Sequence, residues 1–302
     1  MISNGDPSSF PPVRKAVIPA AGFGTRLLPA TKAIPKELLP VIDKPVLQYV
    51  VEEAVDSGIT QLIVVVSKGK QAIADHLLDN GRLEAHLRAA GKEAALAKVR
   101  DVTGGATVRF VEQPEQRGLG DAVRCARDAV GGEPFAVMLG DTLIVPDAGQ
   151  PAGLRQTLAV YERTGGSVVA VRRVPPALLS RYGIVDGRPV EGDQRTYRLR
   201  RLVEKPPPEA APTDLAIAGR YVFTPDLFDD LEQLTPGHGG ELQLTDAMNA
   251  MAQEKIMHAH LWRATRYDIG SRADYVRCII NLARMDPELS ASLQPGGTGT
   301  AH

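Results

Sequence analysis

Short runs of apolar, mostly β-branched residues alternate with longer amphipathic stretches along the first half of the chain. The apolar runs occupy residues 16–18, 62–66, 108–111, 135–139 and 168–171. The amphipathic stretches have helical spacing and occupy residues 46–55, 73–78, 122–130 and 154–161. Strands too apolar to have a solvated face, separated by helices, are typical of a largely parallel sheet covered on both sides. The pattern therefore predicts an α/β fold with a Rossmann-like, mixed and mostly parallel central sheet flanked by helices.

The regular alternation of apolar runs and amphipathic stretches ends at about residue 182. Predicted strands at 198–204 and 216–223 are separated by turns and a proline run, and helical patterns follow at 225–234, 242–255 and 272–285. No stretch has the composition of a linker between independent domains, so the second half is expected to extend the same sheet. We predict a flexible N-terminal arm over 1–13, a single domain over 14–290 and a flexible tail over 291–302.

Composition and charge narrow the class of partner. The 302 residues include 35 Lys and Arg against 36 Asp and Glu, which gives no electrostatic reason to expect binding to nucleic acid or to a membrane. No segment approaches the roughly 18 consecutive apolar residues of a membrane span, and no apolar signal sequence begins the chain. Cys125 and Cys278 have no metal-ligand spacing and are expected to be reduced, buried thiols. These features predict a soluble, cytoplasmic protein.

The first predicted strand leads directly into a loop of small residues, Ala20-Ala21-Gly22-Phe23-Gly24-Thr25-Arg26. Such a loop lets backbone N–H groups approach a phosphate, although two glycines alone are equally consistent with a tight strand-to-helix turn. A P-loop would need four residues between its glycines, followed by Gly-Lys-Ser/Thr. A dinucleotide-binding fingerprint would need Gly or Ala at Leu27 and an acid at Ser67. The loop matches neither motif, which argues against a nicotinamide oxidoreductase.

Beyond this loop, three cations stand in a segment punctuated by prolines. Arg26, Lys32 and Lys36 lie among Pro29, Pro35, Pro40 and Pro45. Because proline fixes φ and removes chain freedom, the segment is expected to be stiff and to present its cations to an anionic ligand rather than to bulk solvent.

The stretch from Ala20 to Val41, AAGFGTRLLPATKAIPKELLPV, closely resembles the signature of bacterial UTP–glucose-1-phosphate uridylyltransferases. The resemblance implies the nucleotidyltransferase fold, which is similar to that of the type A glycosyltransferases. It implies catalytic roles on the triphosphate for Arg26 and Lys36. It also implies nucleotide contacts from the loop residues Ala20, Ala21, Gly22, Gly24 and Thr25.

A second candidate element follows the third predicted strand, where Gln113 precedes the helix start Gly118-Leu119-Gly120-Asp121. An amide side chain can supply both a donor and an acceptor to a pyrimidine edge, but an ordinary polar strand end is equally consistent with the local sequence. The resemblance implies that Gln113 and Gly118 contact uracil, with Gly118 letting the base lie against the backbone. Asp121 departs from the family, in which we expect His, and this departure bears on fine contacts or turnover.

Two separated aspartates are candidate metal ligands. Asp141 follows an apolar strand at the sheet edge where α/β folds bind ligands, and Mg²⁺ prefers few carboxylates together with phosphate oxygens and water. Its other interpretation is a helix cap. The family usually has Pro where Gly140 stands. Asp268 lies in Tyr267-Asp268-Ile269-Gly270, which matches a late Asp-x-Gly element of the family and implies the second Mg²⁺ ligand; taken alone, it would be a turn residue or an N-cap.

The sugar-binding elements are recognised only by resemblance. Arg181-Tyr182-Gly183 and Val203-Glu204-Lys205-Pro206 are similar to them, which implies that Gly183 packs on the hexose, Glu204 accepts bonds from its hydroxyls and Lys205 neutralises its phosphate and acts in catalysis. Without the family, Glu-Lys-Pro would be a surface strand end. The expected organisation is a nucleotide half at about 14–175 and a sugar half at about 176–290.

The resemblance implies that UTP and glucose 1-phosphate give UDP-glucose and pyrophosphate by in-line attack on the α-phosphorus. A phosphate nucleophile is already anionic, which agrees with the lack of a Ser-His-Asp or Cys-His pattern. A homo-oligomer, dimer or tetramer, is also implied. Two alternatives stay open: a nucleotidyltransferase for another base or sugar, such as dTTP, and a catalytically weak nucleotide-binding regulatory paralogue, which Asp121 and Gly140 keep in view.

Overall fold

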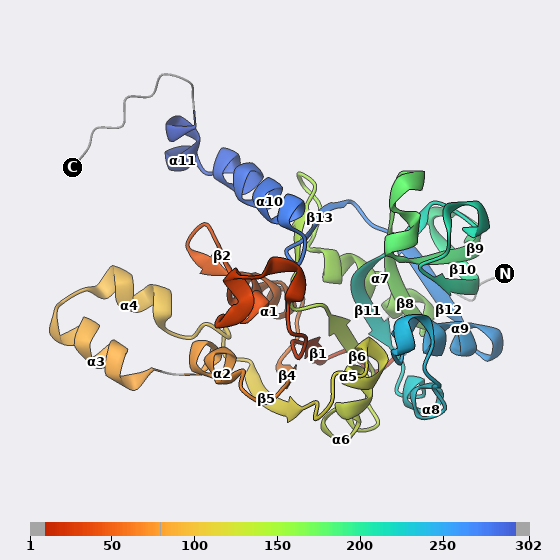
Figure 1. Ribbon diagram of the computed structural model, residues 1–302, viewed down its shortest axis with the longest axis horizontal. Coiled ribbons are helices and arrows are strands. Elements are labelled where there is room, and N and C mark those ends of the chain that lie inside the picture. The colour runs from red at the N-terminus through yellow and green to blue at the C-terminus, as the bar shows by residue number, and fades with distance from the viewer. Residues whose placement is uncertain (1–9, 79, 294–302) are drawn as a thin grey trace.

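The computed structural model describes residues 10–78 and 80–293 (Figure 1). Within this part of the chain a nine-stranded sheet forms the centre of the molecule. Its spatial order is β5 (Thr107–Glu112), β4 (Gln61–Val66), β1 (Lys15–Pro19), β6 (Phe135–Met138), β11 (Leu215–Phe223), β8 (Ser167–Arg173), β12 (Met257–Leu261), β10 (Asp193–Glu204) and β9 (Gly183–Val190).

The direction of the strands changes in the middle of this sheet. Strands β5, β4, β1 and β6 are parallel neighbours, as are β8 and β12. Strand β11 runs antiparallel to β6 and β8, and β10 runs antiparallel to β12 and β9. The α/β class and the mixed sheet are confirmed. Parallel pairing covers less of the sheet than the apolar runs predicted, because a buried antiparallel strand such as β11 is as apolar as a parallel one.

Helices cover both faces of the sheet because successive strand residues point to opposite sides. On β1, Val17 packs into one core cluster, whereas Ala16 and Ile18 pack into the other. The first face is covered by α5 (Leu119–Cys125), α6 (Arg127–Val130), α8 (Leu227–Glu232) and α9 (Leu244–Glu254). The second face is covered by α1 (Val46–Asp56), α2 (Gln71–Leu77) and α7 (Gly153–Thr164).

Two small antiparallel ribbons lie outside the central sheet. They are β2 (Pro40–Val41) with β3 (Lys44–Pro45), and β7 (Thr142–Pro146) with β13 (Ala264–Asp268). Apolar residues of both ribbons share a cluster with α10 (Arg272–Met285), which is followed by α11 (Pro287–Ser292). Short 3₁₀ turns occupy Thr25–Leu27, Ala30–Lys32, Lys36–Leu38, Pro176–Arg181, Pro208–Ala210 and His238–Gly240. The β7–β13 ribbon brings together two chain segments more than a hundred residues apart.

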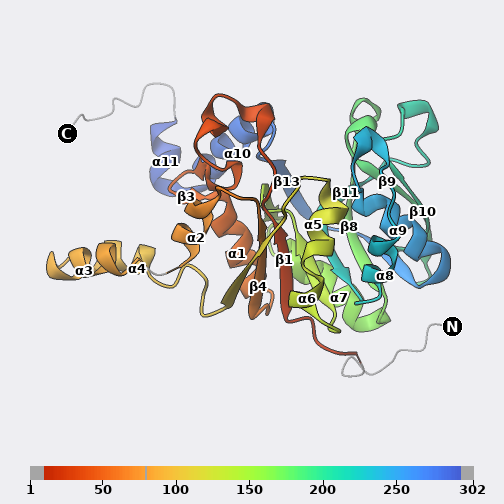
Figure 2. The ribbon, with the colours of Figure 1, turned by 60° about the horizontal axis from the view of Figure 1, so that its bottom comes forward.

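Every strand and helix that the hydrophobic pattern predicts has a counterpart, although the helix predicted at 122–130 is divided into α5 and α6. The pattern missed two polar helices, α3 (Gly81–Ala89) and α4 (Glu93–Val99), which project from one end of the molecule (Figures 1 and 2). It also missed the strands β2, β3, β7, β9, β12 and β13 and the short helix α11. None of the described helices has the length and apolarity needed to cross a bilayer.

Only parts of the predicted arm and tail belong to the described residues. Residues 1–9 and 294–302 lie outside them. Residues 10–13 pack on the domain, because Val13 is buried and the Tyr161 hydroxyl donates a hydrogen bond to the carbonyl oxygen of Pro11.

A buried ion pair joins the central sheet to α1 beside the end of β6. The Arg220 guanidinium on β11 has no solvent exposure and donates to Glu53 Oε2 of α1 at 2.7 and 3.1 Å. The same guanidinium donates to the carbonyl oxygens of Thr142, Gly219 and Leu139. The other oxygen of Glu53 accepts the backbone N–H of Leu154 at the start of α7. Together these bonds fix the turn from Leu139 to Thr142 against α1 and α7.

We expect Arg220→Met to lower the free energy of unfolding by about 3–5 kcal/mol, because it leaves the Glu53 carboxylate buried without its charged partner. Urea denaturation followed by circular dichroism measures the change. Arg200→Met is the matched control, since Arg200 is a strand arginine paired with Asp186 at the surface; its loss should cost less than about 1 kcal/mol. Equal effects of the two substitutions would contradict a structural role for the Arg220–Glu53 pair.

Candidate functional site

The loop after β1 is anchored at both ends and open in the middle. The Ala20 N–H donates to the carbonyl oxygen of Val65, and the Ser67 hydroxyl donates to the carbonyl oxygen of Ala21 at 2.9 Å. Gly22, Thr25 and Arg26 are exposed, as is Phe23. The backbone of this loop is therefore held against the end of β4 while its central residues stay accessible to a ligand.

Gly24 has a positive φ of 69°, and a Cβ there would lie 3.2 Å from Cβ of Lys36 and 3.3 Å from Cγ2 of Thr31. The Thr31 hydroxyl donates to the carbonyl oxygen of Gly24 at 2.8 Å. Glycine is required at this position both by the backbone conformation and by the close approach of the proline-rich segment. The expected stiff segment thus folds back onto the loop and places Lys36 beside it.

Lys36 Nζ lies 2.6 Å from Asp141 Oδ2 and 3.8 Å from the point where a Cβ on Gly22 would stand. Burial alone would lower the pKa of Lys36, but Asp141 and Glu37 hold it above its ordinary value. Burial alone would raise the pKa of Asp141, but Lys36 lowers it to about 2. Because this pKa lies below its ordinary value of 3.8, the pair stabilises the fold above that pH, and the contribution is lost as the pH falls towards 2.

The β7–β13 ribbon brings the two predicted metal ligands to one place. Asp268 lies opposite Thr142, the residue after Asp141, and the N–H of Ile269 donates to the carbonyl oxygen of Asp141. A Cβ on Gly270 would stand 3.0 Å from Asp268 Oδ1 and 3.2 Å from Asp141 Oδ2. The nearest atom to this point is Arg26 Nη2 at 2.7 Å, so the absence of a side chain at Gly270 lets the Arg26 guanidinium approach both carboxylates.

A cation fits this pair of carboxylates. Lys36 and Arg26 now neutralise them, with Arg26 Nη1 at 3.6 Å from Asp268 Oδ2. The described residues contain no cluster of three or more His, Cys, Asp or Glu side chains suited to a metal. Two carboxylates with no third protein ligand among these residues match an ion that takes its other ligands from water and substrate phosphates, as Mg²⁺ does.

A cavity of about 510 Å³ adjoins these carboxylates and collects the predicted sugar-site residues. Glu204 at the end of β10 faces Gly183 at the start of β9, and its Oε2 accepts the Thr245 hydroxyl at 2.6 Å. Lys205 Nζ lies 3.2 Å from Glu204 Oε1. A Cβ on Gly183 would come within 2.7 Å of Ile217 and 2.9 Å of the Thr245 hydroxyl. Gly183, Glu204 and Lys205 line the cavity together with Arg26 and Asp268, although these five residues come from three distant parts of the sequence.

Arg266 is a cavity residue that the sequence reasoning missed. It is buried, lies over the Tyr182 ring at 5.4 Å and donates to the carbonyl oxygen of Ala218. Its Nη1 atom is buried and, within the described residues, makes no hydrogen bond. It also helps to lower the pKa of Asp141. The short strand β13 gave no sequence signal. Arg266 stands two residues before Asp268, however, and this spacing could have marked it as close to the carboxylates.

The sequence analysis also missed an ion pair, Lys70 with Glu37, that supports the loop after β1. Lys70 donates to Glu37 Oε2 at 2.9 Å and also to the carbonyl oxygen of Ala20. Glu37 is 1% exposed, and burial raises its pKa while Lys70 opposes the shift. Burial likewise lowers the pKa of Lys70, opposed by Glu37. The side chain of Lys70 thus fixes the backbone at the exit from β1, next to Lys36.

The structure changes the expected roles of Gln113 and Gly118. The Gln113 amide nitrogen donates to Asp121 Oδ2 at 2.8 Å and to the carbonyl oxygen of Gly118 at 3.2 Å. These bonds occupy both amide hydrogens, so Gln113 does not offer a ligand both a donor and an acceptor. A Cβ on Gly118 would lie 2.7 Å from the carbonyl oxygen of Leu242. The structural requirement for glycine at this position is therefore close packing against the loop before α9, rather than space for a base.

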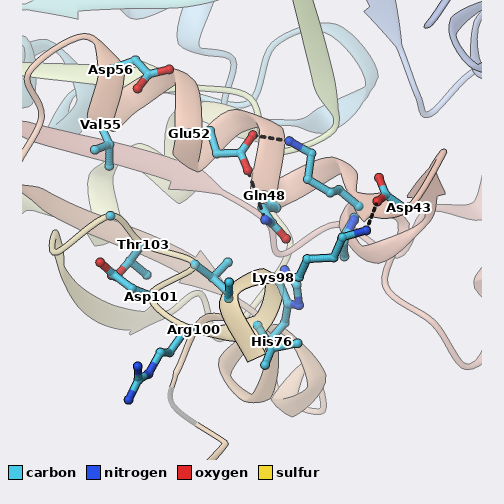
Figure 3. Close-up of a pocket in the computed structure, with 16 residues that line it drawn as sticks. Asp43, Gln48, Glu52, Val55, Asp56, His76, Lys98, Arg100, Asp101 and Thr103 are labelled. Carbon is cyan, nitrogen blue, oxygen red and sulfur yellow. Dashed lines mark hydrogen bonds and ion pairs between the residues drawn. The ribbon is translucent and has the colours of Figure 1, made fainter. Parts of the chain in front are cut away.

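Another cavity, of about 870 Å³, lies elsewhere (Figure 3). It is lined by residues 43–56 and 97–104 together with His76, and it contains none of the predicted site residues. Two ion pairs at its wall, Lys44 with Glu52 and Lys98 with Asp43, satisfy charges of both signs. The convergence of cations, carboxylates and glycine-bounded spaces makes the smaller cavity and the adjoining loop the candidate site.

Known proteins are similar to this chain over most of its length. The family model described as nucleotidyl transferase matches residues 15–284. The UTP–glucose-1-phosphate uridylyltransferase of Bacillus subtilis (strain 168) is 46% identical over 283 residues, 94% of this chain and 95% of that protein. The corresponding protein of Staphylococcus epidermidis (strain ATCC 12228 / FDA PCI 1200) is 46% identical over 282 residues, 93% of this chain and 96% of its own.

Solved structures are similar over the same extent. A UDP-glucose pyrophosphorylase complexed with UDP-glucose superposes with a TM-score of 0.83 and 36% identity, covering 91% of this chain and 100% of that one. The UTP-bound enzyme from Acinetobacter baumannii has a TM-score of 0.85 and 36% identity, covering 93% of this chain and 96% of its own.

Removal of Lys36 should raise the pKa of Asp141 into a range that can be titrated without unfolding the protein. In Lys36→Met, burial is no longer offset by the nearest cation, so we expect the pKa of Asp141 to rise from about 2 to above 3.8. The ¹³C shift of the Asp141 carboxyl, followed by NMR between pH 4 and 7, should be flat in the unaltered protein and should titrate in the variant. Lys44→Met, which breaks a pair in the larger cavity, is the control and should leave this shift flat. A flat Asp141 signal in Lys36→Met would show that Lys36 does not set this pKa.

Proposed function

The chain belongs to the nucleotidyl transferase family, within it to the UTP–glucose-1-phosphate uridylyltransferases, and we propose that it transfers the uridylyl group of UTP to glucose 1-phosphate. The products are UDP-glucose and pyrophosphate. The observation that carries the proposal is the convergence of Arg26, Lys36, Asp141 and Asp268 beside a cavity lined by Glu204 and Lys205. Such a site collects cations for phosphates and hydrogen-bonding groups for a sugar within one space.

The reaction requires no protein nucleophile. A phosphate oxygen of glucose 1-phosphate forms a bond to the α-phosphorus of UTP, and the bond from that phosphorus to the oxygen of the β-phosphate breaks, so that the electron pair leaves with pyrophosphate. The attacking oxygen is already anionic near neutral pH. The barrier therefore comes from repulsion between anions, and catalysis depends on positioning and fixed charge.

The nucleotide half, residues 14–175, supplies the groups for the triphosphate. The accessible backbone from Gly22 to Thr25 would donate N–H groups to phosphate oxygens, with Gly22 and Gly24 allowing the close approach. Lys36 and Arg26 would exchange their carboxylate partners for phosphates. Burial lowers the pKa of Lys36, and the negative charge of Asp141 opposes this effect. A triphosphate that replaces Asp141 would supply negative charge in its place and so keep the lysine protonated.

The sugar half, residues 176–290, supplies the groups for glucose 1-phosphate. Glu204 already accepts the Thr245 hydroxyl and has a second oxygen for a sugar hydroxyl, while Gly183 lets the start of β9 pack closely against Ile217 and Thr245 at the cavity wall. Lys205 and Arg266, whose Nη1 has no hydrogen-bond partner among the described residues, lie on the same cavity and would neutralise the sugar phosphate. Arg266 is thus added to the residues that the sequence suggested.

We propose Mg²⁺ as the metal that Asp141 and Asp268 hold. When bound, it would offset the charge on the phosphates at the α-phosphorus. With the metal in place, Lys36 and Arg26 would no longer be needed as partners of these carboxylates and would become available to the triphosphate. The ion pairs of the free protein thus keep both sets of groups in position.

Compartment and assembly are further proposals. Cys125 and Cys278 are free thiols, and we propose the reducing cytoplasm as the compartment. We also propose a homo-oligomer, a dimer or a tetramer. It is supported by the exposed apolar residues Val276 and Ile280, which lie one turn apart on α10, and by Leu28, which lines a shallow hollow with Val276. Sedimentation velocity tests the assembly, and a monomer at micromolar concentration would contradict it.

A pyrophosphate-release assay tests the function directly. The purified protein is assayed with UTP, dTTP, CTP, ATP or GTP, each paired with glucose 1-phosphate or another hexose 1-phosphate. We expect UTP with glucose 1-phosphate to have the highest kcat/KM. A higher value with dTTP or with another sugar would replace the proposed substrates. Binding of UDP-glucose without pyrophosphate release would instead support a catalytically weak regulatory paralogue.

Asp141→Asn should raise the Mg²⁺ concentration needed for half-maximal rate at least about tenfold, because a neutral amide is a weaker ligand for a hard cation. The measurement is a Mg²⁺ titration of pyrophosphate release at saturating substrates. Asp147→Asn is the control, since Asp147 follows the same strand β7 and is exposed. An unaltered Mg²⁺ requirement in Asp141→Asn would exclude this residue as a ligand.

A further inference from the structure

The orientation of one buried amide carries an inference about base selection. Gln113 ends β5 with its own N–H bonded to the carbonyl oxygen of Val66, so it stands beside the end of β4, to which Ser67 ties the loop at Ala21. Its side chain is 3% exposed and reaches Asp121 on α5, which is 1% exposed. The amide thus lies close to the edge of the sheet at which the nucleotide loop begins.

Asp121 cannot donate a hydrogen bond to Gln113. Its Oδ1 is paired with the Arg124 guanidinium at 2.7 Å, and Arg117 lies 3.9 Å from the same oxygen. A carboxylate in this setting is an acceptor only, and so is the carbonyl oxygen of Gly118. Two acceptors on one side of the Gln113 amide require its nitrogen to face them. The orientation therefore follows from the chemistry of the neighbours.

The consequence is that Gln113 has only its carbonyl oxygen left for a ligand. Both amide hydrogens are used by Asp121 and Gly118, whereas Oε1 accepts no hydrogen bond from any described residue. An acceptor at this place matches the N3–H of uracil or thymine. Cytosine carries an unprotonated N3, so the same oxygen would face a lone pair.

We propose that Asp121 is a positioning residue that selects UTP over CTP by fixing the orientation of the Gln113 amide. The proposal rests on the proposed function and takes Gln113 to contact the base of the nucleotide, as the family resemblance implies. Asp121 touches no substrate and acts only through Gln113. Discrimination arises because the wrong base leaves two acceptors opposed in a buried site.

Asp121→Asn tests this role with little change of shape. Arg124 can only donate, so in this variant it holds the oxygen of the substituted side chain and directs the new amide NH₂ towards Gln113. The Gln113 amide then faces one donor, the new NH₂, and one acceptor, the Gly118 carbonyl oxygen, so its orientation is no longer fixed and it can present its NH₂ to the base, which suits cytosine N3. Asp121→Ser is a second variant, because a hydroxyl can donate or accept and so no longer fixes the amide. Asp128→Asn removes the same charge from an exposed position on the neighbouring helix α6 and is the matched control.

The readout is the ratio of kcat/KM for UTP to kcat/KM for CTP, measured by pyrophosphate release with glucose 1-phosphate. We expect a ratio of at least about 100 for the unaltered protein, and a fall of at least about tenfold in Asp121→Asn and Asp121→Ser. Asp128→Asn should keep the original ratio. A general loss of stability would lower both values of kcat/KM together and leave their ratio unchanged.

The outcomes separate the two proposals. No release of pyrophosphate from UTP by the unaltered protein would overturn the proposed function itself. Good turnover of UTP together with equal use of CTP would overturn the inference about Asp121 alone. A variant that folds, as shown by its thermal unfolding, and keeps the original ratio would overturn it as well.

Discussion

The site depends on a buried arginine that holds one turn of the chain in place. Arg220 joins Glu53 of α1 to three carbonyl oxygens at and beside the turn between β6 and β7, and the same glutamate accepts a backbone N–H at the start of α7. Asp141 is carried by this turn. A rotation of the turn would move its carboxylate away from Lys36 and from Gly270, so the position of the central charge is set by a group that touches no substrate. Replacement of such a pair by apolar residues often preserves stability, and its value in this protein is the fixed geometry of the carbonyl groups.

Fixed geometry matters because the proposed reaction uses charge rather than a reactive side chain. Lys36, Arg26 and Arg266 surround two carboxylates, and each cation is held by the fold before any ligand arrives. Charges that are already oriented need no reorganisation when the phosphoryl group passes between its two partners. The same arrangement explains why the protein tolerates so many ionised groups in one place, since its cations and carboxylates neutralise one another.

The sequence predicted the positions of helices and strands better than the direction in which each strand runs. It likewise identified candidate site residues better than their hydrogen-bond partners. Apolar runs identify β11 as buried but do not show that it runs antiparallel between β6 and β8. The motif around Lys36 identifies a cation for phosphates because proline and glycine spacing is local information. Arg266 was missed because its partner strand β7 is distant in sequence and short, and its burial depends on pairing that no periodicity encodes. Gln113 was recognised, but its free hydrogen-bonding atom could not be predicted before Asp121 and Gly118 were seen around it.

Three aspartates of this chain show why residue type alone does not give a role. Asp141 is partly exposed, pairs with Lys36 and approaches Gly270, where we propose that it meets the cation. Asp121 is buried between Arg124 and the amide of Gln113, and both of its oxygens are already occupied. Asp268 has one oxygen on the backbone N–H of Gly270 and the other near the exposed Arg26. Asp141 and Asp268 converge beside Gly270, and Asp268 lines the cavity of the proposed site, whereas Asp121 is enclosed by its partners and does not line that cavity. The surroundings of each carboxylate therefore distinguish the two proposed metal ligands from the proposed positioning residue.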